Sequence, residues 1–335
     1  QVSGTHGIGV LMANSLMFQR FPDHNGYDDP QFSSFYGQTL PLLKRGIPVE
    51  LVHMENTPFK DTFNGLQVLV MSYSNMKPMK SEYHNYMADW VKKGGTLVYC
   101  GEDVDPYQTV LEWWNTAGNA YKAPSEHLFE AMGLSRNPGD GTYRFGKGTV
   151  IVMREDPKHF VLKGGNDRKY FETIVSAYES KTGKKIEIKN NFMVERGPYT
   201  IAAVMDESSS KEPLKLSGLY IDLFDKDLPV LTVKQINPGE QGYLYDLNKV
   251  LGKVKAKVLC GASRIYDEKV GKQSYSFVAK SPLHTTNVSR VLLPRKPGKV
   301  LVNGKAEQPE WDESSKTLLL SFENDPAGVN VSIEW

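Results

Sequence analysis

The spacing of hydrophobic and polar positions changes near the middle of the chain. Before about residue 165, apolar runs of strand length alternate with segments whose apolar residues recur every three or four positions. The predicted strands are 7–13, 48–54, 66–72, 96–100 and 148–153. The predicted helices are 31–45, 81–93, 125–132 and 167–180, with one more that starts at Asp105. This alternation predicts an α/β region with an open, doubly wound parallel sheet.

The helix that starts at Asp105 bears on function because it contains two adjacent tryptophans. Helical spacing places Tyr107, Leu111 and Trp114 on its inner side. A helix cannot bury two neighbouring residues on one face, so we expect Trp113 to be exposed. An exposed tryptophan is a frequent hot spot for subunit contact or for stacking on a sugar ring, and packing beneath a neighbouring loop is the alternative.

After about residue 185 the pattern has period two, and turn signals such as Pro238-Gly239 and Asn303-Gly304 separate the segments. Such a pattern is typical of antiparallel strands that pack as an all-β sandwich of the immunoglobulin-like kind. We therefore expect two domains: an α/β domain over residues 1–184 and a β-sandwich domain over residues 185–335.

Charge and composition narrow the function classes. Lys and Arg number 40 against 39 Asp and Glu, a net charge of +1, so the chain lacks the basic field that nucleic acid would require. The longest apolar runs are far shorter than the roughly 20 residues that span a bilayer, and we expect no membrane span. Two cysteines, Cys100 and Cys260, cannot form a disulfide framework.

The chain begins with Gln1 and lacks a basic and apolar leader. We therefore expect either a mature secreted form or a piece of a longer chain. A periplasmic or secreted location follows from that expectation.

Polar residues follow several predicted strands at the carboxyl edge, where α/β sheets collect ligands. Ser15 follows the first strand and Ser74 the third. The residues that we expect to line one binding pocket there are Asn14, Ser72, Tyr73, Glu102 and Asp103, and Trp113 is a further candidate for binding. Glu102 and Asp103 could bind a sugar hydroxyl, a metal or a cation, and solvated loop carboxylates are the alternative. One Asp-x-Asp without a third ligand is a weak metal site, so we expect no metal.

Cys100 ends the fourth strand and is the candidate nucleophile. Its surroundings lack the tight strand-turn-helix of a nucleophile elbow, because the next helix begins only at Asp105. A buried structural cysteine is the alternative. A catalytic Cys100 would need a base, for which His127 and His159 are the candidates. Histidine spacing predicts no zinc site and no glycine-rich stretch matches a nucleotide-binding loop, so we expect no cofactor.

Several segments resemble a known family. Those in the first half are 36–37, 42–50, 68–72, 90–99 and 146–152. They resemble the class I glutamine amidotransferase-like domain, in the version that serves as the trimerisation domain of family 42 β-galactosidases. The resemblance implies a flavodoxin-like fold for the α/β domain. Segments 297–305, 316–322 and 333–335 resemble the small β-sandwich that ends many glycosidases.

The resemblance implies an accessory role. Amidotransferases of this family place His-Pro-Glu after a late strand, whereas this chain has Arg154-Glu-Asp-Pro157 there. In the glycosidase relatives a preceding (β/α)₈ barrel holds the two catalytic carboxylates, and no such barrel fits before residue 165. We therefore expect a C-terminal portion of a longer enzyme or a standalone accessory protein.

The leading hypothesis is thus a non-catalytic oligomerisation region of a β-galactosidase-like glycoside hydrolase, with sugar binding as an added role. Its expected partners are the catalytic barrel of the same polypeptide and further copies of this chain in a homo-oligomer. The competing hypothesis is an amidase or hydrolase of the amidotransferase-like superfamily that uses Cys100.

Overall fold

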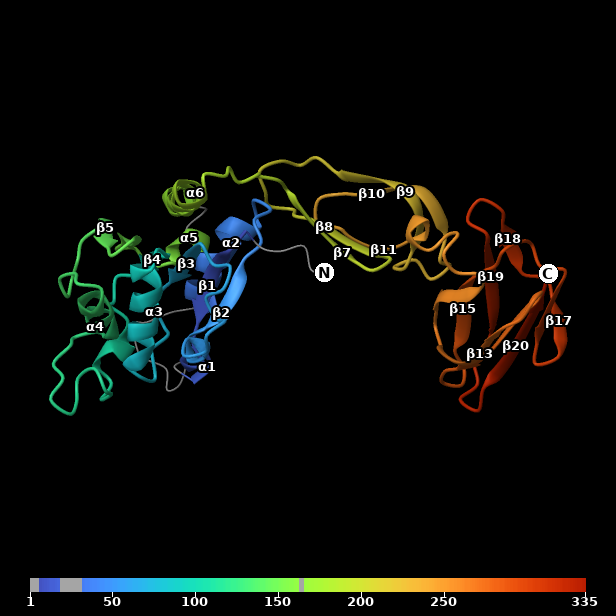
Figure 1. The fold of residues 1–335 in the computed structure, drawn as a ribbon, viewed down its shortest axis with the longest axis horizontal. Helices are drawn as coiled ribbons and strands as arrows, with labels where there is room; N and C mark the ends of the chain where they lie inside the picture. Colours follow the sequence, from blue (N-terminus) through green and yellow to red (C-terminus); the bar gives the residue numbers. More distant parts are fainter. Residues whose placement is uncertain (1–5, 19–31, 163–165) are drawn as a thin grey trace. The chain divides into compact units, whose positions relative to one another are not determined.

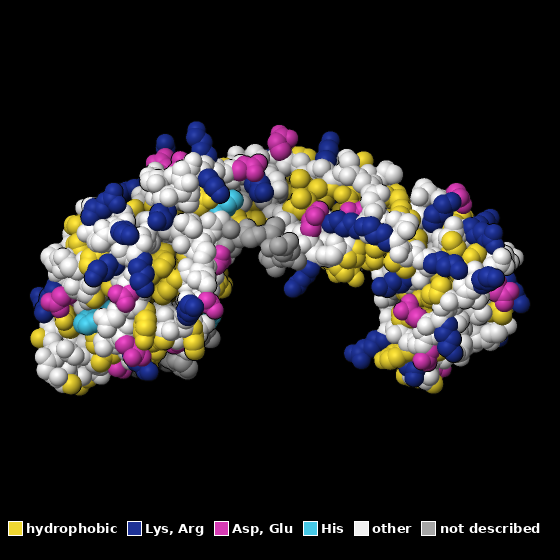
Figure 2. Space-filling model, viewed as in Figure 1, with side chains coloured by type: hydrophobic (Ala, Val, Ile, Leu, Met, Phe, Trp, Pro, Cys, Tyr) yellow, Lys and Arg dark blue, Asp and Glu magenta, His cyan; other side chains and the backbone are white. Residues whose placement is uncertain are grey.

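The computed structural model describes residues 6–18, 32–162 and 166–335, and these form two compact units (Figure 1). The α/β unit holds the described residues up to Asn190 together with Glu207–Ser210. The β unit holds Asn191–Asp206 and Lys211–Trp335. No helix in the described residues is long and apolar enough to cross a membrane. Figure 2 shows acidic and basic side chains interspersed on the visible face of each unit.

The α/β unit is built on a six-stranded mixed sheet. Its strands, in spatial order, are β2 (Glu50–His53), β1 (Ile8–Met12), β3 (Val68–Met71), β4 (Thr96–Cys100), β6 (Gly148–Met153) and β5 (Gly141–Phe145). Neighbouring strands are parallel except that β5 runs antiparallel to β6. The sequence-based expectation of a wholly parallel sheet is therefore corrected. A turn at Gly146 and Lys147 connects β5 to β6 directly, and the left-handed backbone of Gly146 (φ 58°) closes it.

Helices cover both faces of this sheet. One face packs against α2 (Ser33–Leu43), α5 (His159–Leu162) and α6 (Arg168–Thr182), and the other against α3 (Glu82–Lys92) and α4 (Pro124–Ala131). Short elements are α1 (Ser15–Phe18) and the 3-10 helices η2 (Met54–Asn56) and η3 (Pro106–Thr109). Successive strand residues point to opposite faces, so β3 and β4 are buried along their whole length. Their continuous apolar runs follow from that double burial.

Two helical segments, α2 and the one after Asp105, do not bury a simple apolar stripe. In α2 the buried positions include Gly37 and Gln38, whereas Tyr36 is 44% exposed. The reason is a close backbone approach, because a Cβ on Gly37 would lie 1.8 Å from the carbonyl oxygen of Pro157. After Asp105 the chain forms only η3, and Leu111 is 83% exposed rather than inward.

The β unit contains three antiparallel sheets. The first has the order β10 (Val230–Ile236), β9 (Leu214–Asp222), β11 (Gln241–Asp246), β8 (Tyr199–Val204) and β7 (Asn191–Arg196). The second has the order β12 (Lys257–Gly261), β15 (Thr286–Leu292), β19 (Thr317–Glu323) and β18 (Glu310–Asp312). The third has the order β13 (Arg264–Val270), β14 (Ser274–Lys280), β20 (Val329–Glu334), β16 (Lys299–Val302) and β17 (Lys305–Glu307). The 3-10 helix η4 (Leu247–Lys249) follows β11.

The second and third sheets share one hydrophobic core and form a β-sandwich. Val291 and Leu318 from one sheet pack in the same cluster as Phe277 and Val331 from the other. Alternate strand residues point into this core, as the period-two pattern predicts. The coarse architecture, α/β followed by antiparallel β, is thus confirmed, and the domain boundary at residue 184 stays a prediction.

Candidate functional site

The loops that follow β3 and β4 meet at a buried ion pair on the carboxyl edge of the sheet. The Nζ of Lys77 lies 2.8 Å from the Oδ2 of Asp105, and the two side chains are 2% and 1% exposed. Burial lowers the pKa of Lys77, and the negative charge of Asp105 opposes that shift. Asp105 also accepts hydrogen bonds from the backbone N–H of Tyr107 (3.0 Å) and from the side chain of Gln108 (2.7 Å). The predicted helix cap at Asp105 is confirmed, although it caps η3.

Lys77 also fixes the end of β1. The hydroxyl of Ser15 donates to the carbonyl oxygen of Lys77 (2.6 Å) and accepts from its backbone N–H (2.9 Å). Three loops of the carboxyl edge are therefore tied together by Ser15, Lys77 and Asp105. All three residues are buried.

Asp103 forms a second closed cluster on the same edge. Its carboxylate accepts hydrogen bonds from the hydroxyls of Tyr99 and Ser125 and pairs with the guanidinium of Arg154 at 2.6 Å. Its backbone is left-handed (φ 60°), which turns the side chain inward, where it is 10% exposed. Burial raises the pKa of Tyr99 well above its ordinary value, and the charge of Asp103 raises it further. Asp103 is therefore not the solvated loop carboxylate of the alternative expectation, and its role in binding stays a prediction.

The other predicted edge residues do not converge on one pocket. Ser72 and Tyr73 are fully buried, and the Ser72 hydroxyl accepts from the backbone N–H of Ser74 at 3.0 Å. Asn14 and Glu102 are exposed, and neither side chain bonds to another described residue. The structure thus divides the predicted set into buried structural residues and exposed loop residues.

Trp113 is half-buried, so the expected exposed ring is wrong. Its indole N–H donates to the carbonyl oxygen of Pro78 at 2.8 Å. The ring meets the edges of His84 and His127, with centroids 5.6 and 5.2 Å away. Packing beneath a neighbouring segment, the alternative interpretation, describes Trp113 in this structure.

Two histidines form a buried chain of hydrogen bonds that sequence reasoning missed. The Nε2 of His84 lies 2.6 Å from the hydroxyl of Tyr73, and its Nδ1 lies 2.8 Å from the Nδ1 of His127. Burial lowers the pKa of His84 well below its ordinary value, with a smaller effect from His127, and burial lowers the pKa of His127 as well. Both imidazoles are therefore held neutral near pH 7.

Cys100 is fully buried, and it lies on the opposite face of the sheet from the hydrogen-bonded pair His84 and His127. Burial raises the pKa of its thiol well above the ordinary value, and the carboxylates of Glu155 and Asp156 raise it further. Among the described residues no histidine bonds to its sulfur, and His127 is held by His84. The described residues contain no group of three or more His, Cys, Asp or Glu that could hold a metal.

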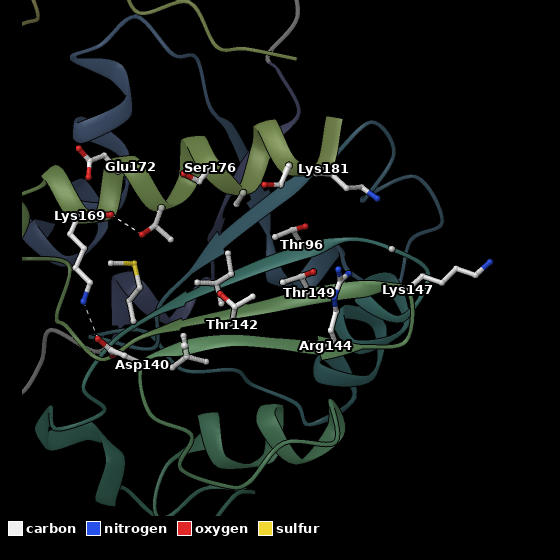
Figure 3. A pocket seen from close by; sticks show the side chains of 18 residues that line it. Thr96, Asp140, Thr142, Arg144, Lys147, Thr149, Lys169, Glu172, Ser176 and Lys181 are labelled. Carbon is white, nitrogen blue, oxygen red and sulfur yellow. Dashed lines mark hydrogen bonds and ion pairs between the residues drawn. The ribbon is translucent and has the colours of Figure 1, made fainter. Parts of the chain in front are cut away.

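A groove of about 710 Å³ lies between α6 and the exposed face of β5 and β6 (Figure 3). Helix α6 covers β3 and β4, whereas β5 is joined to β6 by a hairpin, and no helix in the described residues covers β5 on this face. The side chains that line it are rich in hydroxyls and charges: Thr96, Asp140, Thr142, Arg144, Lys147, Thr149, Lys169, Glu172, Thr173, Ser176, Ser180 and Lys181. None of these residues is among the predicted site residues, because β5 was not predicted from the sequence.

An apolar sheet face lies on the first sheet of the β unit, which contains β7 to β11. It is formed by Val194, Ile201, Tyr243 and Phe224. Val194 and Tyr243 stand opposite Ile201 in the ladders, so the three side chains share one face. Phe224 packs beside Tyr243 with ring centroids 5.9 Å apart. Ile201 is 46% exposed and Phe224 is 62% exposed. Exposed apolar side chains grouped in this way are typical of contact surfaces.

No family model and no curated protein matches the chain. Solved structures that resemble it include Gan42B, a GH42 β-galactosidase from G. stearothermophilus (13% identity, TM-score 0.43, 72% of this chain and 40% of that one). The β-galactosidase from Bacillus circulans sp. alkalophilus is 11% identical with a TM-score of 0.44, and the match covers 72% of this chain and 41% of that one. The β-galactosidase from Halorubrum lacusprofundi is 13% identical with a TM-score of 0.40, and the match covers 72% of this chain and 40% of that one. The chain therefore spans about two fifths of the length of these enzymes. Identities and TM-scores this low assign no function to the chain.

Proposed function

We propose that this chain is a non-catalytic accessory region of a carbohydrate-active enzyme of the β-galactosidase-like kind. One observation carries the non-catalytic part: the buried charged groups of the carboxyl edge are paired with one another. Lys77 is neutralised by Asp105 and Asp103 by Arg154, and the Cys100 thiol is buried with a raised pKa. A reactive edge would instead keep a nucleophile and a base in contact and open to substrate.

The carbohydrate part of the proposal rests on the sequence resemblance to the amidotransferase-like trimerisation domain and the glycosidase-type sandwich. The strand order of the α/β unit supports it, because the five parallel strands follow the order 2-1-3-4-6 with helices on both faces. This is the order of doubly wound, flavodoxin-like sheets. We extend the proposal to an amidotransferase-like domain over 1–184 and an immunoglobulin-like domain over 185–335, in a periplasmic or secreted enzyme.

The partner part of the proposal is a catalytic barrel in the same polypeptide and a homo-oligomeric assembly. The apolar sheet face supports a contact role, because Ile201 and Phe224 keep much of their apolar surface in water in the isolated chain. Covering such surface stabilises an assembly by about 25 cal/mol for each Å² removed from water.

Turnover and thiol labelling test the non-catalytic role. The purified chain is expected to hydrolyse neither aryl galactosides nor glutamine. Iodoacetamide at pH 7 is expected to label Cys100 only after unfolding in guanidinium chloride, with the unfolded chain as the matched control for reagent quality. Rapid labelling of native Cys100, abolished by His159→Gln or His127→Gln, would instead establish the competing cysteine hydrolase.

A further inference from the structure

One end of the groove between α6 and the β5–β6 hairpin carries cations that have no carboxylate partner. Arg144, Lys147 and Lys181 line this end, and none of the three forms an ion pair with a described residue. The charges at the other end are compensated, since Lys169 pairs with Asp140 at 3.0 Å and Glu172 with Arg168 at 2.8 Å. The groove therefore has a net positive end and a neutral end (Figure 3).

Hydroxyl groups line the floor beside these cations. Thr96, Thr149 and Arg144 are register partners across β4, β6 and β5, so their side chains form one row on the same face of the sheet. Strands lie about 4.8 Å apart, so Thr96 and Thr149 are direct neighbours on the floor. Neither threonine hydroxyl bonds to another described side chain or backbone group. Figure 3 shows Arg144 directed from the floor toward α6, which contributes Ser180 and Lys181 to the opposite wall.

The floor is held in place by tight backbone packing. The backbone N–H of Thr149 donates to the carbonyl oxygen of Gly95 at 3.1 Å, and that of Lys147 to the carbonyl oxygen of Lys92 at 2.9 Å. A Cβ on Gly148 would lie 1.9 Å from the carbonyl oxygen of Val91, so only glycine allows this approach. The backbone of this floor is therefore already ordered before a ligand binds.

A helix dipole accounts for only one of the cations. Lys181 lies in the last turn of α6, where a positive charge is favoured by the helix dipole. Arg144 is on an edge strand and Lys147 is in a turn, and neither position has such a counter-charge. Three uncompensated cations around one concave surface repel each other, and a bound anion would relieve that repulsion.

We propose that this groove binds a polyhydroxylated oxyanion, an acidic saccharide whose carboxylate lies between Arg144 and Lys181 and whose hydroxyls bond to Thr96 and Thr149. The oxyanion part rests on the groove alone, and the saccharide part rests on the proposed function. Arg144 supplies a planar guanidinium that can hold a carboxylate through two hydrogen bonds. The threonine hydroxyls can each donate to and accept from a sugar hydroxyl.

Titration calorimetry on the full chain tests the site with three probes: galacturonate, neutral galactose and sodium sulfate. Galacturonate is expected to bind at least tenfold more tightly than galactose, and sulfate is expected to compete with it. Raising the salt concentration from 20 to 200 mM is expected to weaken galacturonate binding as the Debye length shortens. Binding of sulfate without binding of galacturonate overturns the saccharide assignment, and equal binding of galactose and galacturonate overturns the oxyanion assignment.

Matched variants locate the binding. Arg144→Gln and Lys181→Gln are each expected to weaken galacturonate at least fivefold, and Thr149→Val to weaken it less. Lys122→Gln, an exposed lysine outside the groove, is the control and should leave the affinity unchanged. Circular dichroism confirms that each variant is folded. An Arg144→Gln variant that is folded and binds normally overturns the proposal. Turnover by the chain, by contrast, would overturn the accessory role and leave this titration unaffected.

Discussion

The ammonium of Lys77 and the carboxylate of Asp105 bind each other at 2.8 Å with almost no exposure to solvent. A lysine buried to this degree is rare, and it is tolerated because its charge is compensated and its remaining protons have acceptors such as the carbonyl oxygen of Tyr73. The pair occupies the place where a sheet of this type would hold a ligand.

Removing one partner of this pair is expected to destabilise the α/β unit strongly. Lys77→Ala leaves Asp105 as an uncompensated buried charge, and we expect a loss of about 3–5 kcal/mol in the free energy of unfolding measured in urea. Lys80→Ala is the control, because Lys80 pairs with Glu82 at the surface and should cost less than about 1 kcal/mol. Equal losses for the two variants would contradict this prediction.

Acid is expected to destabilise the α/β unit through His84 and His127. Burial lowers both pKa values in the folded state, so below the unfolded value of about 6.5 the unfolded chain takes up protons that the folded chain does not. Stability is therefore fully present above pH 7 and is lost as the pH falls through 6.5. His84→Gln should reduce the difference in unfolding free energy between pH 7.5 and 5.5 by about 1 kcal/mol. His6→Gln, which removes an exposed imidazole instead of a buried one, is the matched variant for comparison.

Truncation of Trp113 is expected to behave as a packing defect. Trp113→Ala should cost about 3 kcal/mol of unfolding free energy, the lower end of the range for a buried tryptophan, because the ring is half-buried. Trp113→Phe keeps a ring against His84 and His127 but loses the hydrogen bond to Pro78, and should cost about 1 kcal/mol. If Trp113→Ala left the thermal midpoint unchanged, the ring would have to be exposed in solution.

A charge on the apolar sheet face is expected to weaken assembly without unfolding the chain. Ile201 is 46% exposed, so Ile201→Lys should change the thermal midpoint little. We expect the molar mass from light scattering to fall toward that of a monomer. Lys215→Glu, an exposed charge change on β9 of the same sheet, is the control. A wild-type chain that is already monomeric at high concentration would contradict a contact between copies at this face.

The central strands and α3 were predictable because the spacing of apolar residues within each short segment indicates which side chains are buried. The run Val68–Met71 is apolar throughout since helices cover both faces, and α3 presents Met87 and Val91 at helical spacing. The β-sandwich was predictable for the same local reason, since its strands alternate between core and solvent.

The polar clusters were not predictable because they join residues that are distant in sequence. Lys77 lies 28 residues from Asp105, and nothing near it distinguishes it from a surface lysine. His84 and His127 lie 43 residues apart and match no motif. Asp105 was correctly expected to cap, but the element that it caps ends at Thr109, so the predicted helix with an outward Trp113 does not form.

Within the part of the chain that the structure describes, the hairpin strand β5 leaves the sheet with an open edge, as β2 does at the other side. Open edges invite pairing with strands of other molecules, and proteins discourage such pairing with charged edge residues. Arg144 lies on β5 and Glu50 on β2, so each edge carries a charge that opposes aggregation. The arginine that we assign to a ligand thus has a second role in keeping the chain soluble. Arg144→Lys separates the two roles, because it keeps the positive charge on the edge strand but loses the planar guanidinium that can hold a carboxylate through two hydrogen bonds.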